Sequence, residues 1–370
     1  MINPEKRAEL LRPKMMKDGK YLIARIKGSG QEKDPEKIIG NFFRWKQYIG
    51  HHTPYEEEWL KASLEEVWSP KFLGLSKDFW SKPIEQVKKL EFQNPAYSGA
   101  HAFNGKRGDP RNYSKVFTTQ LSGCTYGCNY CYVPLEINLA NPNLGRYFSP
   151  KEIIDSFLLI REKSETPINV LRISGGEPTT IVPEIIIDIY AVLEKKDKND
   201  VYLWIDTNLS TTRFLEKVEN DLKDVMQKRN VGIVGCFKGV SKEDFSLITG
   251  VAPQFYKNQF ETAKMFLDFG ADFYVYLPAL VYENNIEQKI EIFVERLKNL
   301  NKNLPLRLRA EVLIIKEYAG ALMNMKLKAK EGRPIPKIDQ RKFFDIWYNR
   351  ILPKYYPQEM LNKFCCEVPL

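Results

Sequence analysis

The chain has 370 residues, 43% of them hydrophobic and 28% charged, a balance that is ordinary for a globular protein. Six cysteines are too few for a disulfide framework in a chain of this length, and no apolar run reaches the roughly 18 residues of a membrane helix. Because the first residues are charged, we expect no signal peptide, a cytoplasmic location and no membrane partner. The net charge of +9 suits nucleic acid, an acidic peptide or an anionic cofactor, but also a lysine-rich solvated surface.

Residues 1–115 differ in composition from the rest of the chain. Four of the six tryptophans lie there among helix-like segments, so we expect a mainly helical, aromatic-rich N-terminal extension. Within it, "KYLIARIKGSG" predicts a short strand followed by a turn. Residues 96–115 are rich in glycine, polar and basic residues, which is typical of a linker or a long loop.

From residue 116 onward, strand and helix patterns alternate. Strands are expected at 116–122, 168–174, 201–208, 231–239, 271–281 and 305–315, with amphipathic helix patterns between them. Ser149, Pro150 and Glu152 form a helix start signal, and Gly270 suits the residue just after a helix. We expect one barrel or sheet domain over 116–320, then a basic loop and a C-terminal helix over 321–370.

Six strand–helix units in series predict a parallel sheet covered by helices, because parallel strands need crossover connections. Two architectures satisfy this pattern, an open doubly wound sheet and a full or partial barrel. In both, functional residues gather at the carboxyl ends of the strands. The segments "GCTYGC", "GGEP", "DTN" and "CFKG" all follow predicted strands at that end.

Three cysteines, Cys124, Cys128 and Cys131, lie within eight residues of one another after the first of these strands. A structural zinc site wants four ligands, and none of the three histidines is placed as a matching pair. A [4Fe–4S] cluster normally takes four cysteines. Three ligands in one loop therefore favour a cluster with one iron open to a substrate or cofactor, with zinc and chance packing as the alternatives.

The spacing CxxxCxxC, with an aromatic residue before the last cysteine, resembles the signature loop of the radical S-adenosylmethionine (SAM) superfamily. "SGGEPTT" after the second strand resembles that family's glycine-rich motif. "IDTN" and "FKGVSKEDFSLITG" after the third and fourth strands resemble segments of its glycyl-radical-enzyme activase branch. The resemblance covers residues 116–315 and keeps the family's motif order.

The resemblance implies an α/β fold, a partial (β/α)6 TIM-like barrel, with a [4Fe–4S] cluster on Cys124, Cys128 and Cys131 and SAM on the fourth iron. One electron from a flavodoxin- or ferredoxin-type donor would cleave SAM to methionine and a 5′-deoxyadenosyl radical, which would abstract hydrogen from a substrate. We expect a peptide or protein substrate, of activase or peptide-modifying type. The alternatives are a tRNA-modifying enzyme and a non-catalytic iron–sulfur electron-transfer protein.

The resemblance also implies a set of SAM contacts. In this set the glycines admit the ligand because they lack Cβ, Glu177 accepts from the SAM ammonium, Tyr130 lies beside the adenine, and Lys238 neutralises the carboxylate. Each has a simpler alternative: an ordinary strand-to-helix turn, loop packing, helix capping or a surface lysine. The full expected set is Tyr130, Ser174, Gly175, Gly176, Glu177, Pro178, Asp206, Asn208 and Lys238.

Several residues depart from the family's pattern. Cys236 stands where activases carry an aspartate for a cation site, and a thiol is a poor ligand for a hard cation. Cys365 and Cys366 are too few for a further cluster; Cys366 is a candidate hydrogen-atom donor, or both are unreactive thiols. The basic stretch 326–333 and the loop 96–115 suit contact with RNA, or are solvated loops or a lid over the barrel.

Overall fold

The structure is a computed structural model. It describes residues 1–25, 42–47, 115–131, 133–164, 168–278, 280–281, 285–311, 328–330, 332, 340–361, 363 and 368–370. The expectations for Cys365, Cys366 and most of the 96–115 and 326–333 segments lie outside these residues. Within the described ranges, no helix has the length and apolar character needed to cross a bilayer.

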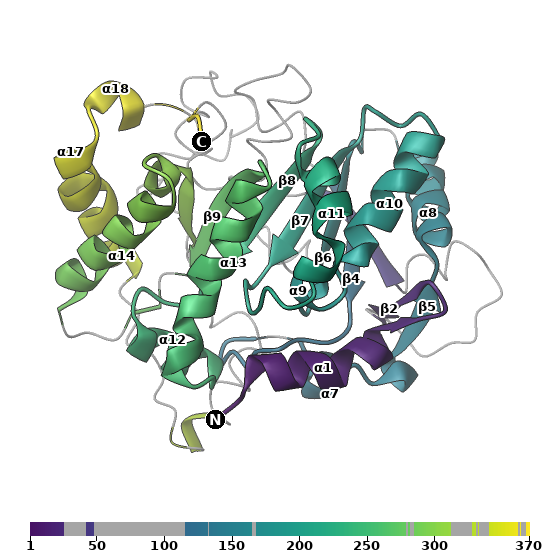
Figure 1. Ribbon diagram of the computed structural model, residues 1–370, viewed down its shortest axis with the longest axis horizontal. Coiled ribbons are helices and arrows are strands. Elements are labelled where there is room, and N and C mark those ends of the chain that lie inside the picture. The colour runs from purple at the N-terminus through teal and green to yellow at the C-terminus, as the bar shows by residue number, and fades with distance from the viewer. Residues whose placement is uncertain are drawn as a thin grey trace.

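Six parallel strands follow one another across the sheet in the order in which they occur in the chain. A doubly wound sheet would reverse its strand order partway, so of the two expected architectures the barrel type is the one found. The first and last of these strands do not pair in the described part of the chain, and the sheet is an open, partial barrel (Figure 1). The strands are β4 (Lys115–Leu121), β6 (Val170–Gly175), β7 (Tyr202–Thr207), β8 (Val231–Cys236), β9 (Asp272–Pro278) and β10 (Leu308–Glu311).

Helices connect these strands and cover one face of the sheet (Figure 1). The predicted start signal is confirmed, since Ser149 and Glu152 form a reciprocal capping box, and Gly270 has the positive φ of +80° expected after a helix. The main helices are α8 (Pro150–Lys163), α9 (Pro178–Ile181), α10 (Glu184–Lys195), α11 (Glu219–Met226), α12 (Lys242–Thr249), α13 (Tyr256–Asp268) and α14 (Ile286–Leu300). Shorter pieces are α7 (Leu135–Asn138), η3 (Pro142–Leu144), η4 (Glu216–Val218), η5 (Pro253–Phe255) and η6 (Leu304–Arg307).

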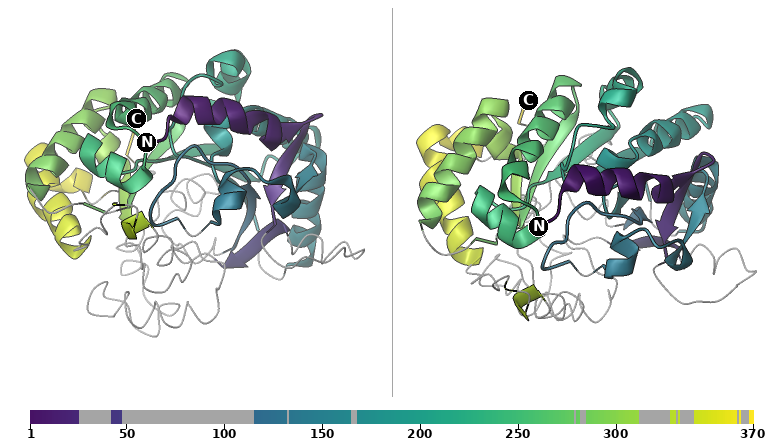
Figure 2. Two further views of the ribbon diagram at one scale, coloured as in Figure 1. Left: turned by 90° about the horizontal axis from the view of Figure 1, so that it is seen from below. Right: turned by 60° about the horizontal axis from the view of Figure 1, so that its bottom comes forward.

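The described N-terminal residues contribute strands as well as a helix. The expected strand in "KYLIARIKGSG" is present, and it pairs antiparallel with β4 and β5, while β3 runs antiparallel along β4. Helix α1, capped by Asn3, lies across the carboxyl edge of the sheet in both views of Figure 2. These elements are α1 (Pro4–Met15), β1 (Met16–Lys17), β2 (Lys20–Ala24), β3 (Phe43–Gln47) and β5 (Gly145–Phe148).

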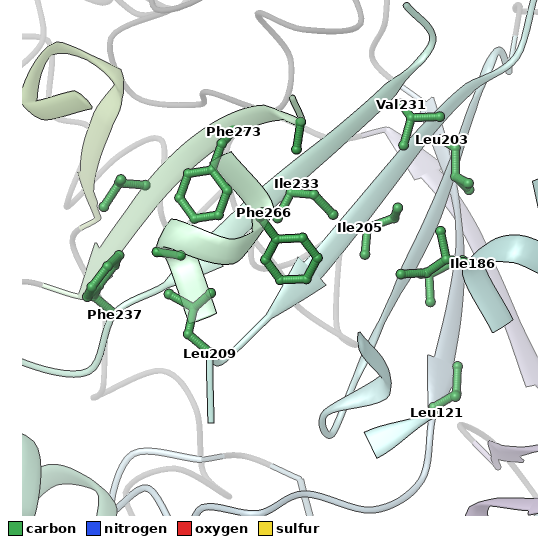
Figure 3. Packing of buried hydrophobic residues seen from close by; sticks show 14 of the residues in the cluster. Leu121, Ile186, Leu203, Ile205, Leu209, Val231, Ile233, Phe237, Phe266 and Phe273 are labelled. Carbon is green, nitrogen blue, oxygen red and sulfur yellow. The ribbon is translucent and has the colours of Figure 1, made fainter. Parts of the chain in front are cut away.

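Alternation along the parallel strands gives the sheet two different faces. The residues facing the helices are aliphatic or aromatic and form the main core, such as Leu203, Ile205, Ile233 and Phe273 (Figure 3). The intervening residues, on the barrel interior, include the polar side chains that make up the candidate site. An arginine or aspartate there must find a charged partner, because burial of an unpaired charge is strongly unfavourable.

The C-terminal helices pack against α14 rather than against the sheet (Figure 1). Trp347 is fully buried, with its ring centroid 6.2 Å from that of Phe293, and Lys354 pairs with Glu291 at 2.9 Å. The elements are α16 (Gln340–Asp345), the π-helical turn η7 (Ile346–Ile351), α17 (Leu352–Tyr355) and α18 (Gln358–Leu361).

Candidate active site

The loop that carries the three cysteines is fixed by backbone hydrogen bonds to two helices. The amide of Cys124 donates to the carbonyl of Asn138 in α7 at 2.9 Å. The amides of Gly127 and Asn129 donate to the carbonyls of Thr249 and Ile248, at the end of α12, at 2.9 and 2.8 Å. The loop therefore has a defined path between β4 and α7, braced from the side by α12.

Cys124, Cys128 and Cys131 are not in disulfide bonds, and all three are partly buried. Burial raises the pKa of Cys124 well above its ordinary value, and the charges of the other two cysteines raise it further. Three thiolates can share such a place only if positive charge is supplied with them. In the described part of the chain, no three His, Cys, Asp or Glu side chains are grouped so as to hold a single metal ion.

Two buried asparagines direct amide donors at the sulfur atoms. Asn208 Nδ2 lies 3.6 Å from Cys124 Sγ, and Asn138 Nδ2 lies 3.6 Å from Cys131 Sγ. Cysteine thiolates that ligate an iron–sulfur cluster commonly accept such hydrogen bonds, which tune the reduction potential of the cluster. Asn208 Oδ1 is buried and accepts no hydrogen bond from the residues that the structure describes, so an acceptor beside the cysteines is left for a donor from a ligand. The residues present therefore fit an iron–sulfur cluster with a polar ligand next to it.

The glycine turn after β6 is packed directly on the cysteine loop. The amide of Gly176 donates to the carbonyl of Leu121 at 3.0 Å, and that of Glu177 donates to the carbonyl of Gly123 at 2.7 Å. A Cβ on Gly176 would lie 1.7 Å from the Gly123 oxygen, and one on Gly175 would lie 2.4 Å from the Leu121 oxygen. We expected the missing Cβ atoms to make room for a ligand; in the structure, backbone from the end of β4 and the start of the cysteine loop fills that space.

Glu177 is fully buried and satisfied by protein donors. Its carboxylate accepts from the Thr180 amide at 2.9 Å, from Thr207 Oγ1 at 3.0 Å, and from the Asn208 amide. Burial raises its pKa to about 7, and the hydrogen bonds from Asn208 and Thr180 act against this shift. It also caps α9, whose first residue is Pro178. Glu177 thus links the carboxyl ends of β6 and β7 next to the start of the cysteine loop.

Asp206 lies on the barrel interior and pairs with Arg172, which the sequence analysis missed. Arg172 Nε lies 2.8 Å from Asp206 Oδ2, which also accepts from Ser174 Oγ at 2.6 Å. The other oxygen, Oδ1, accepts from Trp204 Nε1 at 2.8 Å, and the Arg172 guanidinium lies 4.1 Å from the Trp204 ring centroid. A charged residue within the apolar run "NVLRIS" was the one available signal of this pair.

At the end of β8, Lys238 lies beside the cysteine loop. Its Nζ is 5.7 Å from the ring centroid of Tyr130 and 6.0 Å from that of Tyr276. Burial raises the pKa of the neighbouring Cys236 thiol to about 12. Gln259, a second residue that was missed, accepts from the Lys238 amide at 3.1 Å and donates to the Asn208 carbonyl at 2.9 Å. It joins the carboxyl ends of β7 and β8.

The predicted residues of β4, β6, β7 and β8 are thus brought together at one edge of the sheet, under α1. The hydrogen bonds link the cysteine loop to the glycine turn, and Asn208 to both. Cys366 lies outside the described residues, so its proposed role stays a prediction.

The model of the radical SAM superfamily matches residues 120–293, which hold every one of these motifs. None of the curated proteins compared with the chain matches it. Among solved structures, spore photoproduct lyase complexed with dinucleoside spore photoproduct is 11% identical over 64% of this chain and 72% of its own, with a TM-score of 0.43. SuiB of Streptococcus suis bound to SAM is 17% identical over 65% of this chain and 49% of its own, with a TM-score of 0.33.

Residues 120–293 thus form a radical SAM domain. The chain is accordingly a radical SAM enzyme whose cofactors are a [4Fe–4S] cluster and SAM. The non-catalytic iron–sulfur alternative is not retained. The activase-like branch, the substrate and the individual SAM contacts stay predictions.

Proposed function

We propose that the enzyme holds its cluster on Cys124, Cys128 and Cys131 and acts on a peptide or protein. When bound, the cluster and SAM supply a 5′-deoxyadenosyl radical that abstracts hydrogen from the substrate. The observation that carries the cluster assignment is the pair of buried amide donors, from Asn138 and Asn208, directed at the sulfurs of Cys131 and Cys124. No other group of cysteines in the described ranges has such donors.

This chain's residues hold and orient the reacting groups. Glu177 accepts a hydrogen bond from the backbone amide of Asn208. This holds Asn208 so that its side-chain Oδ1, which has no partner among the described residues, lies beside Cys124. We infer that this oxygen accepts a hydrogen bond from the polar end of SAM, and that Lys238 provides positive charge for its carboxylate. Asp206 acts through Arg172 and Ser174 as a positioning residue of the barrel interior. Tyr130 lies next to Lys238, and we infer that its ring contacts the adenine of SAM.

The proposal of a large substrate is supported by the open barrel. In the described residues, β4 and β10 do not pair with each other, so the sheet is open on that side rather than closed into a full barrel. A peptide segment is long and narrow enough to enter such an opening. The barrel interior offers it Trp204 and Arg172, an aromatic ring and a buried cation in contact with each other.

The cluster assignment is tested by anaerobic reconstitution of the wild type and of Cys124→Ser, Cys128→Ser and Cys131→Ser. With dithionite and SAM, the wild type should form 5′-deoxyadenosine, and each variant should lose both iron and product. Cys236→Ser is the matched control: Cys236 is a partly buried thiol outside the loop, so this variant should retain iron and cleavage. Full iron content in a loop variant would overturn the assignment.

The substrate class is tested by hydrogen transfer. Hydrogen taken from a substrate enters 5′-deoxyadenosine, so the wild type is incubated with deuterated peptide and deuterated tRNA extracts in separate reactions. Deuterium in 5′-deoxyadenosine from the peptide extract alone supports the proposal. Deuterium in 5′-deoxyadenosine from the tRNA extract alone would show that the substrate is tRNA and not a peptide.

A further inference from the structure

A groove of about 390 Å³ is lined mainly by residues of α12, α13 and α14. Figure 1 shows these three helices on the helix-covered side of the sheet. Four cationic side chains and one carboxylate line this groove. Its apolar lining is Val240, Pro253, Tyr256 and Ile292, and residue Ile292 is 52% exposed. The cations are Lys242, Lys257, Lys289 and Arg296, and the carboxylate is Glu243.

Arg296 is the cation most clearly left for a partner. Its guanidinium lies 3.6 Å from the ring centroid of Phe260 and 4.7 Å from that of Tyr256. Within the described part of the chain, no carboxylate forms a salt bridge with it. A guanidinium that is held flat by rings and has free N–H groups is well suited to a carboxylate on another molecule.

The lysines are partly neutralised by their own neighbours. Lys289 lies 3.1 Å from the buried Asp244, and the exposed Lys257 and Lys242 lie 3.0 Å from Glu261 and 3.8 Å from Glu243. Exposed pairs of this kind are weak and exchange readily for contacts with a partner. Glu243, Asp244 and Glu261 offset the three lysines, so the positive charge in excess is that of Arg296. This excess favours a partner with an acidic surface.

The groove is connected to the cysteine loop by a row of buried rings. The ring of Tyr256 lies 5.5 Å from that of Phe245, and the ring of Phe245 lies 5.5 Å from that of Tyr126, both between centroids. Tyr126 stands between Cys124 and Cys128. Helix α12 makes the same connection, since its first turn lines the groove and its last residues brace the loop. A donor bound in the groove is therefore separated from the cysteines by a few buried side chains.

We propose that this groove docks an acidic, low-potential one-electron carrier protein that reduces the cluster. The proposal rests on the proposed function, since only a redox-active cluster needs such a donor. In the step, one electron leaves the carrier, which is oxidised, and enters the cluster, which is reduced; no bond forms or breaks. The apolar part and the carboxylate of Glu243 favour a protein over a nucleic acid, whose backbone would meet that negative charge.

The test compares two charge reversals on the same helix. Lys257→Glu reverses a groove lysine, and Lys264→Glu reverses a lysine elsewhere on α13 that forms the same i,i+4 ion pair, with Asp268 at 2.7 Å. Cluster reduction by an acidic flavodoxin hydroquinone is followed by stopped-flow absorbance. Lys257→Glu should reduce the second-order rate constant about 3- to 10-fold at low salt, with the difference fading as salt rises. Lys264→Glu should match the wild type.

Other measurements separate the possible failures. Dithionite should reduce both variants at the wild-type rate, because it needs no docking. Equal flavodoxin rates for the two variants would overturn the docking proposal, as would Lys257→Glu losing affinity for labelled tRNA while keeping its flavodoxin rate. If the loaded wild type failed to cleave SAM with dithionite, the proposed function would fall. Binding of the flavodoxin, measured by fluorescence anisotropy on both variants, would still decide whether the groove docks an acidic protein.

Discussion

The backbone amide of Glu177 donates a 2.7 Å hydrogen bond to the carbonyl of Gly123, so the glycine turn after β6 and the residue before the first cysteine of the loop are held together. This contact joins segments more than fifty residues apart in sequence. It makes the position of the cysteines depend on a turn that carries no cysteine.

Gly176→Ala should separate the two loops. The new Cβ would lie 1.7 Å from the Gly123 oxygen and 2.4 Å from its carbon, both backbone atoms that cannot rotate away. We expect loss of most bound iron after reconstitution, and a free energy of unfolding lower by about 3 kcal/mol or more. Gly127→Ala is the control within the cysteine loop, since its Cβ would meet only the end of the Ile2 side chain, at 3.1 Å, and a backbone oxygen at 3.4 Å. Equal iron contents in the two variants would contradict the packing.

Glu177 should make stability depend on pH. Burial raises its pKa to about 7 from an ordinary 4.5, so the folded protein holds an extra proton between these values. The contribution of Glu177 to the free energy of unfolding is largest below pH 4.5. It falls as the pH rises toward 7 and is constant above that pH. Relative to Glu177→Gln, which cannot titrate, the wild type should lose up to about 3 kcal/mol across this window. Urea unfolding at four pH values measures this, with the surface variant Glu261→Gln expected to parallel the wild type.

Arg172 and Asp206 should behave as a buried ion pair. Arg172→Met leaves the Asp206 carboxylate without its cation in the barrel interior, where the Arg172 side chain is 3% exposed. Breaking such a pair destabilises a protein by about 3–5 kcal/mol. The double variant Arg172→Met/Asp206→Leu should recover part of this loss, because no charge is left unpaired. Lys264→Met breaks an exposed pair and should change stability by less than about 1 kcal/mol; unfolding in guanidinium compares all three.

Asn138 should tune the cluster. Its amide donates to Cys131 Sγ, so Asn138→Leu removes a hydrogen bond that is stronger when the cluster carries more negative charge. We expect the reduction potential to become more negative by a few tens of millivolts, since about 59 mV corresponds to ~1.4 kcal/mol for one electron. Potentiometric titration followed by EPR gives the value, with Asn143→Leu in the nearby η3 as control. An unchanged potential at full iron content would show that the amide does not act on the sulfur.

Much of the fold was predictable because its signals are local. The alternation of apolar strands with amphipathic helices gave the six parallel strands within a few residues, and Ser149 with Glu152 marked a helix start that the structure confirms. The exception was the start of the sixth strand, which lies at Leu308 rather than at residue 305 because η6 occupies Leu304–Arg307; residues 312–315 lie outside the described part of the chain. Choosing between a doubly wound sheet and a barrel needed the order of strands across the sheet, which no local pattern contains.

The candidate site divides in the same way. The sequence by itself determined which loop holds the cysteines and which turns accompany it, because spacing within a loop and the residue at a strand's end are written in consecutive letters. Only the tertiary structure decided that the glycines make room for backbone, that Glu177 is held by Asn208, Thr180 and Thr207, and that Asp206 pairs with Arg172. These partners lie on different strands or loops. Which side chains meet is set by strand register and by the need of each buried charge for a partner, and both exist only once the sheet has formed.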